Sequence, residues 1–196
     1  MKSIHVISSF IHYNVAKEIN RFAPKSVVDM GGEGKLAKFI PHKVTDANLT
    51  AEIDATCLPW PDNTFDIAVS IATLEHVDNW QQFLLESLRV SSTAVIHWFP
   101  CGRAAKEAEL LKKTLGHEHP CALPDELNLK NFLSNYRAIR WSLAPLMTVG
   151  EHLLLLGTIN SNLNHPRAFE VIHRIGRDPY GFLLTMTKRG NGDDSQ

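Results

Sequence analysis

A short apolar run that ends in a carboxylate and a glycine-rich turn constrains the fold more than any other feature of this sequence. The run, from Ser26 to Met30, is rich in β-branched residues, and Asp29 lies near its end. Uninterrupted runs of this kind are typical of buried parallel strands. Glycines at positions 31, 32 and 34 allow a tight turn and a close approach of a ligand to the backbone. Because residues 35–40 are compatible with a helix, we predict a strand, a glycine loop and a helix.

Open α/β sheets bind their ligands beyond the carboxyl ends of the strands, which is where this glycine loop would lie. The loop lacks the Gly-Lys-Ser/Thr ending of a phosphate-binding loop and the full Gly-x-Gly-x-x-Gly pattern of dinucleotide enzymes. Taken alone, it leaves two interpretations open, a cofactor loop and a purely structural turn between a strand and a helix.

The residues that follow the loop are more specific. Val44 to Asp46 places an acid after a second short apolar run, and Asp54 to Asp66 contains an Asp-Ala pair, Leu-Pro and a terminal Phe-Asp. A hydrophobic run and the tetrapeptide Leu74 to Val77, Leu-Glu-His-Val, complete the pattern. From Val27 to about Val90 the chain resembles the class I S-adenosylmethionine-dependent methyltransferases, in particular the type 11 methyltransferase domain.

The resemblance implies an α/β fold, with a Rossmann-like, open and mostly parallel sheet, helices on both faces and an antiparallel last strand. We expect one domain over residues 1–196. Asn14 is placed to cap a first helix that ends before Pro24, and Asp78 to cap a helix after a strand at 65–71. The other expected strands are at 27–28, 44–46, 93–99, 137–146 and 182–187, and the other expected helices follow residues 104 and 123.

Two features depart from the family pattern. Only seven residues separate Asp46 from Asp54, where members of the family fit a helix and a third strand. That strand is therefore vestigial, or a short irregular connection replaces the helix. The glycine loop is also one residue shorter than the common Asp-x-Gly-x-Gly-x-Gly form.

Two segments in the second half are expected to lie outside the common fold. Residues 151–176 have helical patterns where the fold needs only a hairpin, so we expect a helical insertion that forms a lid or cap. Residues 189–196 are rich in Gly, Asn and Asp and are expected to form a disordered tail.

The resemblance implies a cofactor, S-adenosylmethionine, and a residue for each of its polar ends. Asp46 would accept hydrogen bonds from the two ribose hydroxyls. Asp54 would accept from the adenine amino group, with the backbone of Ala55 nearby. The alternatives are a solvated turn residue for Asp46 and a turn cap for Asp54.

The methionine end of the cofactor requires a close approach to the backbone, which Gly31, Gly32 and Gly34 would permit. Asp29 would act through ordered water or by holding the loop. Ile71 and Leu74 follow the strand at 65–71 and would line the adenine or the methionine. For these two residues, a place in the core is the alternative.

Methyl transfer is a displacement at a carbon that positive sulfur already activates, so the protein mainly positions the acceptor and removes its proton. The reaction requires no protein nucleophile and no metal. His76 is the best-placed proton acceptor in the sequence. Leu-Glu-His-Val recurs in family members with different substrates, however, so a structural or cofactor-side role for His76 is the alternative.

Other histidines could contact the acceptor. His12 and Tyr13 precede the first strand and could line a substrate entrance, or they could be surface residues. His117 and His119 have a spacing that can bind zinc, but no second pair of ligands lies at a suitable distance. We therefore expect no metal there, and a polar loop or a substrate contact instead.

Composition limits the function classes. The formal net charge of −1 includes no basic surplus of the kind that indicates binding to nucleic acid or anionic membranes. The longest aliphatic run, residues 153–156, is too short to span a bilayer. The first residues are too polar for a secretory signal, and three cysteines form no disulfide framework. The sequence therefore predicts a cytoplasmic protein, and it leaves the oligomeric state open.

The predicted function is the transfer of a methyl group to a small-molecule or glycan acceptor, with oxygen as the acceptor atom. A cofactor-binding module without catalysis is the alternative, which the short loop and the compressed 46–54 connection favour. Methylation of base amino groups is disfavoured, because no Asn/Asp-Pro-Pro-Tyr/Phe tetrapeptide follows the strand at 65–71.

Overall fold

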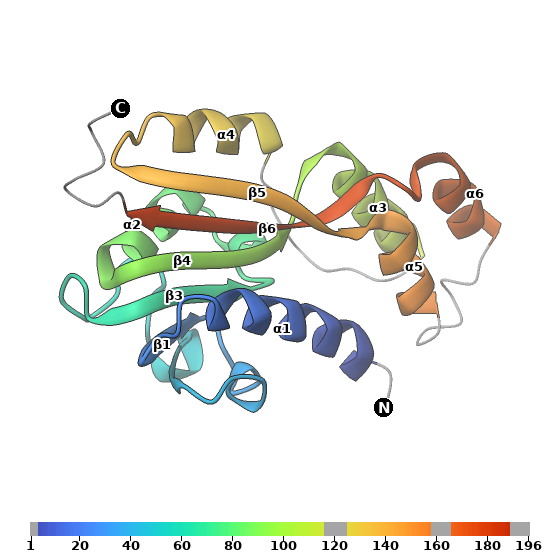
Figure 1. Cartoon of the computed structure of the whole chain (residues 1–196). Helices are drawn as coiled ribbons and strands as arrows, with labels where there is room; N and C mark the ends of the chain where they lie inside the picture. Colours follow the sequence, from blue (N-terminus) through green and yellow to red (C-terminus); the bar gives the residue numbers. More distant parts are fainter. Residues whose placement is uncertain (1–3, 116–124, 158–165, 189–196) are drawn as a thin grey trace.

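Within the residues that this computed structural model describes, 4–115, 125–157 and 166–188, six strands form one sheet (Figure 1). Their order across the sheet is β2-β1-β3-β4-β6-β5. The first four strands in the chain pair in parallel, and β6 pairs antiparallel with both β4 and β5. The strands are β1 (Ser26–Met30), β2 (Lys43–Ala47), β3 (Phe65–Ile71), β4 (Ser91–Pro100), β5 (Ile139–Thr148) and β6 (Pro179–Lys188). The predicted mostly parallel sheet with an antiparallel last strand is therefore confirmed.

Helices cover both faces of the sheet, as predicted. On one face, α1 (Ile4–Asn20), α3 (Gly102–Thr114), α5 (Val149–Gly157) and α6 (Pro166–Ile175) share a core cluster with alternate residues of the central strands. On the other face, α2 (Trp80–Val90) and α4 (Glu126–Ser134) share a second cluster. The central strands are buried on both sides, which explains their uninterrupted apolar runs.

Three helix predictions were wrong in detail. The first helix begins at Ile4, and Asn14 lies inside it, where its side-chain amide donates to Phe10 O over 2.8 Å. Residues 35–40 form only a single 3-10 turn, η1 (Leu36–Lys38). The cap of α2 is Asn79, whose Oδ1 accepts from Gln82 N, and Asp78 lies one residue outside it.

No strand forms between β2 and β3, where the family pattern described above has a helix and a third strand. The described residues there contain one 3-10 turn, η2 (Leu49–Ala51), followed by turns and bends. The irregular connection is therefore the correct alternative, and β2 is left at the edge of the sheet.

The segment between β5 and β6 forms α5 and α6, which lie beside α3 at the end of the sheet where β4 leads into α3 (Figure 1). Leu153 of α5 is 1% exposed and belongs to the same core cluster as Val15 of α1 and Ala108 of α3. This helix is therefore part of the hydrophobic core, and removing it would expose apolar surface on two other helices.

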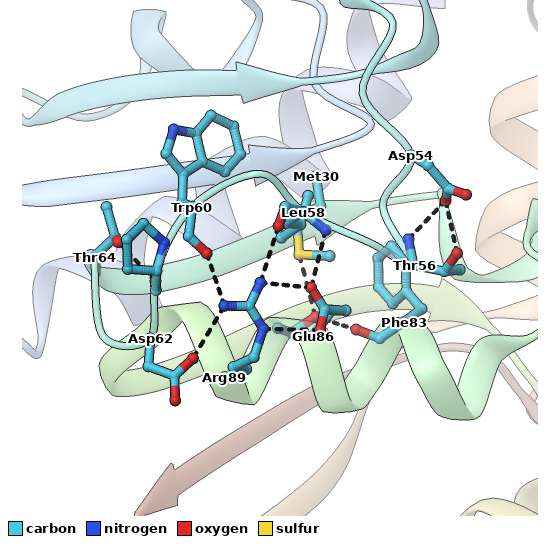
Figure 2. Close-up of polar contacts among 12 residues, drawn as sticks. Met30, Asp54, Thr56, Leu58, Trp60, Asp62, Thr64, Phe83, Glu86 and Arg89 are labelled. Atoms are coloured by element: carbon cyan, nitrogen blue, oxygen red, sulfur yellow. Dashed lines mark hydrogen bonds and ion pairs between the residues drawn. The ribbon is translucent and has the colours of Figure 1, made fainter.

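An arginine on α2 holds the long connection that replaces the third strand (Figure 2). Arg89 donates to the carbonyl oxygens of Leu58 (3.0 Å) and Trp60 (2.7 Å), and to the carboxylates of Glu86 and Asp62. Glu86 Oε2 also accepts from Leu58 N over 2.9 Å. A connection without regular hydrogen bonding is thus held to α2 by charge-assisted hydrogen bonds.

We predict that Arg89→Gln lowers the free energy of unfolding by about 2–3 kcal/mol, because buried carbonyls and the Glu86 carboxylate lose their charged donor. Urea unfolding monitored by circular dichroism would measure the change. Arg21→Gln is the matched control, because Arg21 is 71% exposed in its pair with Glu18 and should change stability by less than about 1 kcal/mol. Equal effects of the two substitutions would contradict this role of Arg89.

Candidate functional site

A cavity of about 540 Å³ lies beyond the carboxyl ends of β1, β2 and β3. Its volume is in the range of small-molecule sites, and its place is the one expected for ligands of open α/β sheets. It is lined by Gly31 and Glu33 of the glycine loop, by residues 47–50 and 53–56 of the connection, and by Thr73 and residues 76–79 after β3.

The glycine loop is packed tightly between β2 and the turn after β3. Gly31 N donates to Ala47 O over 2.6 Å. Gly31 has a φ of 86°, and a Cβ there would lie 2.4 Å from Thr73 Oγ1. Both the backbone angle and the space therefore require glycine at this position. Thr73 is a site residue that the sequence did not indicate, because its role depends on a contact between two loops.

Two carboxylates meet behind this loop. The parallel register of β1 and β2 places Asp29 opposite Asp46. A Cβ on Gly32 would lie 2.5 Å from the Asp29 carboxylate and 2.6 Å from Asp46 Oδ1. Gly32 is therefore the residue that lets both carboxylates approach the loop.

The environment of these two carboxylates favours a ligand that donates hydrogen bonds or carries positive charge. Asp29 is 4% exposed, and burial, with a smaller effect of the Asp46 charge, raises its pKa to about 7. Asp46 Oδ1 is buried and has no hydrogen-bond partner among the described residues. Unpartnered buried acceptors are rare in folded proteins, and a hydroxyl donor would satisfy this one.

Asn48 connects the loop to the cavity wall. Its Nδ2 donates to Gly32 O over 2.5 Å, and its Oδ1 accepts from Ala51 N over 2.9 Å. The sequence analysis missed this residue. An Asn directly after a strand is a cap signal, and that signal could have identified it.

Asp54 lines the cavity and also caps a turn (Figure 2). Its Oδ1 accepts from Thr56 N and from Thr56 Oγ1, each over 2.8 Å, and these hydrogen bonds lower the Asp54 pKa. The turn-cap interpretation is therefore correct, and it is compatible with a ligand contact because Asp54 is exposed to the cavity. Ala55 lines the cavity beside it.

Other predicted site residues lie elsewhere. Leu74 is fully buried in the core cluster under α2 and α4, as the core alternative predicts. Ile71 is partly buried and packs against the opposite cluster, and neither residue lines the cavity. His76 is exposed and lines the cavity.

The two predicted entrance residues on α1 do not line the cavity. His12 is buried, its ring stacks on Phe39 with 5.4 Å between centroids, and its Nδ1 lies 2.6 Å from Ser8 O. Tyr13 is 64% exposed. His117 and His119 lie outside the described residues.

Two further observations concern the part of the chain that the structure describes. None of its helices combines the length and hydrophobicity needed to cross a membrane. It also contains no group of three or more His, Cys, Asp or Glu side chains placed to hold a metal ion.

Comparison with known proteins relates the chain to methyltransferases. Residues 14–99 match a family model described as a methyltransferase domain. No curated protein matches the sequence. Among solved structures, the fold is similar to that of geranyl diphosphate C-methyltransferase from Streptomyces coelicolor A3(2), crystallised with S-adenosyl-L-homocysteine, with a TM-score of 0.64, 11% identity, and coverage of 90% of this chain and 78% of that one.

Two other structures extend the comparison. A geranyl diphosphate methyltransferase in complex with S-adenosylmethionine has a TM-score of 0.65, 13% identity, and coverage of 91% and 85%. The cyclase SpnF has a TM-score of 0.60, 15% identity, and coverage of 91% and 79%. At these identities the likeness is one of fold.

The order and direction of the strands and the loop at the ends of β1 and β2 give this chain the Rossmann-like fold that the solved methyltransferases share. Residues 14–99, a little under half of the chain, match the model of this methyltransferase domain, and the solved structures with a similar fold include S-adenosylmethionine-dependent methyltransferases. The cofactor of this domain is S-adenosylmethionine.

Asp29 should make the stability of the protein depend on pH. Its pKa is about 7 in the folded protein and near the ordinary 3.8 in the unfolded chain, so the folded state holds the proton more tightly. The free energy of unfolding should therefore fall as pH rises from about 4 to about 7, by up to roughly 4 kcal/mol. Asp29→Asn should remove this fall, as measured by urea unfolding at pH 5 and pH 8.

The exposed acid Glu52 provides the control for this measurement. Glu52→Gln removes one carboxylate from the neighbouring connection and should leave the pH dependence unchanged. An Asp29→Asn protein with the same pH dependence as the wild type would contradict the assignment to Asp29.

Proposed function

We propose that this chain is a methyltransferase that binds S-adenosylmethionine in the cavity beside the glycine loop and transfers its methyl group to an oxygen of a small-molecule or glycan acceptor. The observation that carries the proposal is the buried, unpartnered Oδ1 of Asp46 behind that loop. A ribose hydroxyl would supply the missing donor.

The cavity and the carboxylate behind its glycine loop offer partners for each part of the cofactor. Asp46 does not line the cavity but lies against Gly32 and Gly34 of the loop, and it would accept from the ribose. Asp54 and Ala55, which line the cavity, would contact the adenine. The loop at Gly31 would approach the methionine end, because no side chain separates its backbone from the cavity. The negative charge of Asp46 also favours a cationic ligand such as a sulfonium.

The bound cofactor supplies a methyl group that positive sulfur activates. The chain has to orient an acceptor toward it and to accept the acceptor proton. His76 is in the cavity wall, directly after β3, and we propose it as the proton acceptor. An imidazole suits this role because its ordinary pKa lies near neutral pH.

A cofactor-binding module without catalysis is the second candidate. The observation that favours it is the missing third strand, which leaves one cavity wall to the exposed η2 turn, where Leu49 is 82% exposed. A transfer assay with a labelled methyl donor over fractionated lysate would separate the two, because a module binds the cofactor without transferring the label.

Asp46 provides the sharpest test of cofactor binding. Asp46→Asn keeps the size of the side chain and one acceptor but removes the charge, so cofactor affinity should weaken about three- to thirtyfold in calorimetry. Asp46→Ala should weaken it further, because the ribose hydroxyls lose their acceptor.

Glu52→Gln is the matched control, since it removes an exposed acid of the same connection that does not line the cavity. Its affinity for S-adenosylmethionine should equal that of the wild type. Normal binding by both Asp46 variants would place the ribose elsewhere.

A further inference from the structure

The end of β2 holds the first two glycines of the glycine loop. Ala47 O accepts from Gly31 N over 2.6 Å, which is a contact between backbones. The next residue, Asn48, uses its side chain, whose Nδ2 donates to Gly32 O over 2.5 Å. Because Ala47 is the last residue of β2 and is fully buried, these two hydrogen bonds fix the loop to the sheet.

The side chain of Asn48 also holds a second wall of the cavity. Asn48 is the N-cap of the turn η2, and its Oδ1 accepts from Ala51 N over 2.9 Å. Its backbone oxygen accepts from Ala51 N over 3.0 Å and from Ile53 N over 3.1 Å. The glycine loop and the wall at residues 49–53 are therefore joined through a single residue, which itself lines the cavity.

Only an amide group suits this double contact. Gly32 O needs a donor and Ala51 N needs an acceptor, and the Asn48 side chain supplies both. A carboxylate of the same size only accepts. Both polar ends of Asn48 thus have partners within the chain, and through Gly32 the residue acts on the loop.

Gly32 is the point where the position of the loop matters most for a ligand. A Cβ on this residue would lie 2.5 Å from the Asp29 carboxylate and 2.6 Å from Asp46 Oδ1. Among the described residues, Asp46 Oδ1 has no hydrogen-bond partner. A loop that moved by a fraction of an ångström would change the space left for a donor at this oxygen, so the contact from Asn48 helps to set that space.

A second asparagine shows what a cap without this contact looks like. Asn79 also lines the cavity and caps a helix, and its Oδ1 accepts from Gln82 N over 3.2 Å. In the part of the chain that the structure describes, its side chain makes no hydrogen bond to the glycine loop. The two asparagines thus share a cavity and a capping role, and they differ in the contact with Gly32.

We propose that Asn48 is a positioning residue for the cofactor, because its hydrogen bond to Gly32 O, the tether, keeps the glycine loop in the arrangement that binds S-adenosylmethionine. This inference rests on the proposed function and adds a residue to that site. Without the tether, the loop would have to be ordered when the cofactor binds, and ordering a loop reduces affinity. The tether matters here because no strand holds the connection at residues 48–64.

Hydrogen exchange of the free, full-length protein tests the tether without any ligand. Asn48→Asp keeps the acceptor for Ala51 N but removes the donor to Gly32 O. Amides of the glycine loop, at residues 31–34, should therefore exchange about fivefold faster or more, whereas Ala51 N should exchange as in the wild type. Unchanged exchange in the glycine loop would overturn the proposal.

Calorimetry with S-adenosylmethionine measures the effect on the cofactor. In Asn48→Asp the affinity should fall by about tenfold, as expected for the loss of one hydrogen bond. Asn79→Asp is the matched variant, because it adds the same charge to a capping asparagine of the same cavity, and so it measures the effect of the charge alone. An affinity of Asn48→Asp within about twofold of that of Asn79→Asp would overturn the proposal.

The melting temperature separates positioning from capping. Asn48→Ala loses the cap as well as the tether, so its melting temperature should lie about 2–4 °C below that of Asn48→Asp. Positioning predicts that both variants lose affinity for S-adenosylmethionine. If Asn48 were only a cap, affinity would be normal in Asn48→Asp and reduced only in Asn48→Ala, and that result would overturn the positioning role.

The wild type distinguishes a failure of this inference from a failure of the proposed function. If the wild type does not bind S-adenosylmethionine in calorimetry, the proposed function fails, and the positioning role fails with it. If the wild type binds the cofactor and Asn48→Asp binds it equally well, only the positioning role fails and the proposed function stands.

Discussion

The approach of two carboxylates to one glycine determines how this site is built. Asp29 and Asp46 are brought together by the register of β1 and β2, and only a residue without a side chain fits between them at position 32. Burial, with a smaller effect of the neighbouring Asp46 charge, raises the pKa of Asp29 to about 7. The buried, unpartnered Oδ1 of Asp46 lowers the stability of the fold, but it leaves a hydrogen-bond acceptor available for a ligand. Functional sites commonly reduce stability in this way.

The shortened chain after β2 changes how the rest of the cavity is supported. Without a third strand, no ladder of backbone hydrogen bonds holds residues 48–64. Arg89 and Glu86 of α2 bind this connection through its carbonyls and amide, and Asn48 binds it to the glycine loop. Side-chain hydrogen bonds thus hold this connection in place of the backbone hydrogen bonds that a strand would form.

Buried polar groups in this protein fall into two kinds. His97 and the Glu109–Lys112 pair have partners, and they hold elements of the sheet and α3 in place. Among the described residues, Asp46, Glu75, Trp98 and His152 have buried side-chain polar atoms without a hydrogen-bond partner. Because an unpartnered buried atom is costly, the one that lies against the glycine loop, Asp46 Oδ1, marks the place where a ligand is expected.

The sequence by itself determined the order of the elements, the central strands and the glycine loop, because these depend on local patterns: apolar runs, strand-ending acids and glycines. It also indicated Gly31, Asp54, Ala55 and His76, which line the cavity. Only the tertiary structure decided that Leu74 is a core residue, that Asn48 and Thr73 line the cavity, and that His152 is buried against the ring of Tyr180. Those facts depend on strand register and on contacts between segments distant in the chain, such as Gly31 and Thr73. No local pattern encodes which of several apolar or polar neighbours will face inward.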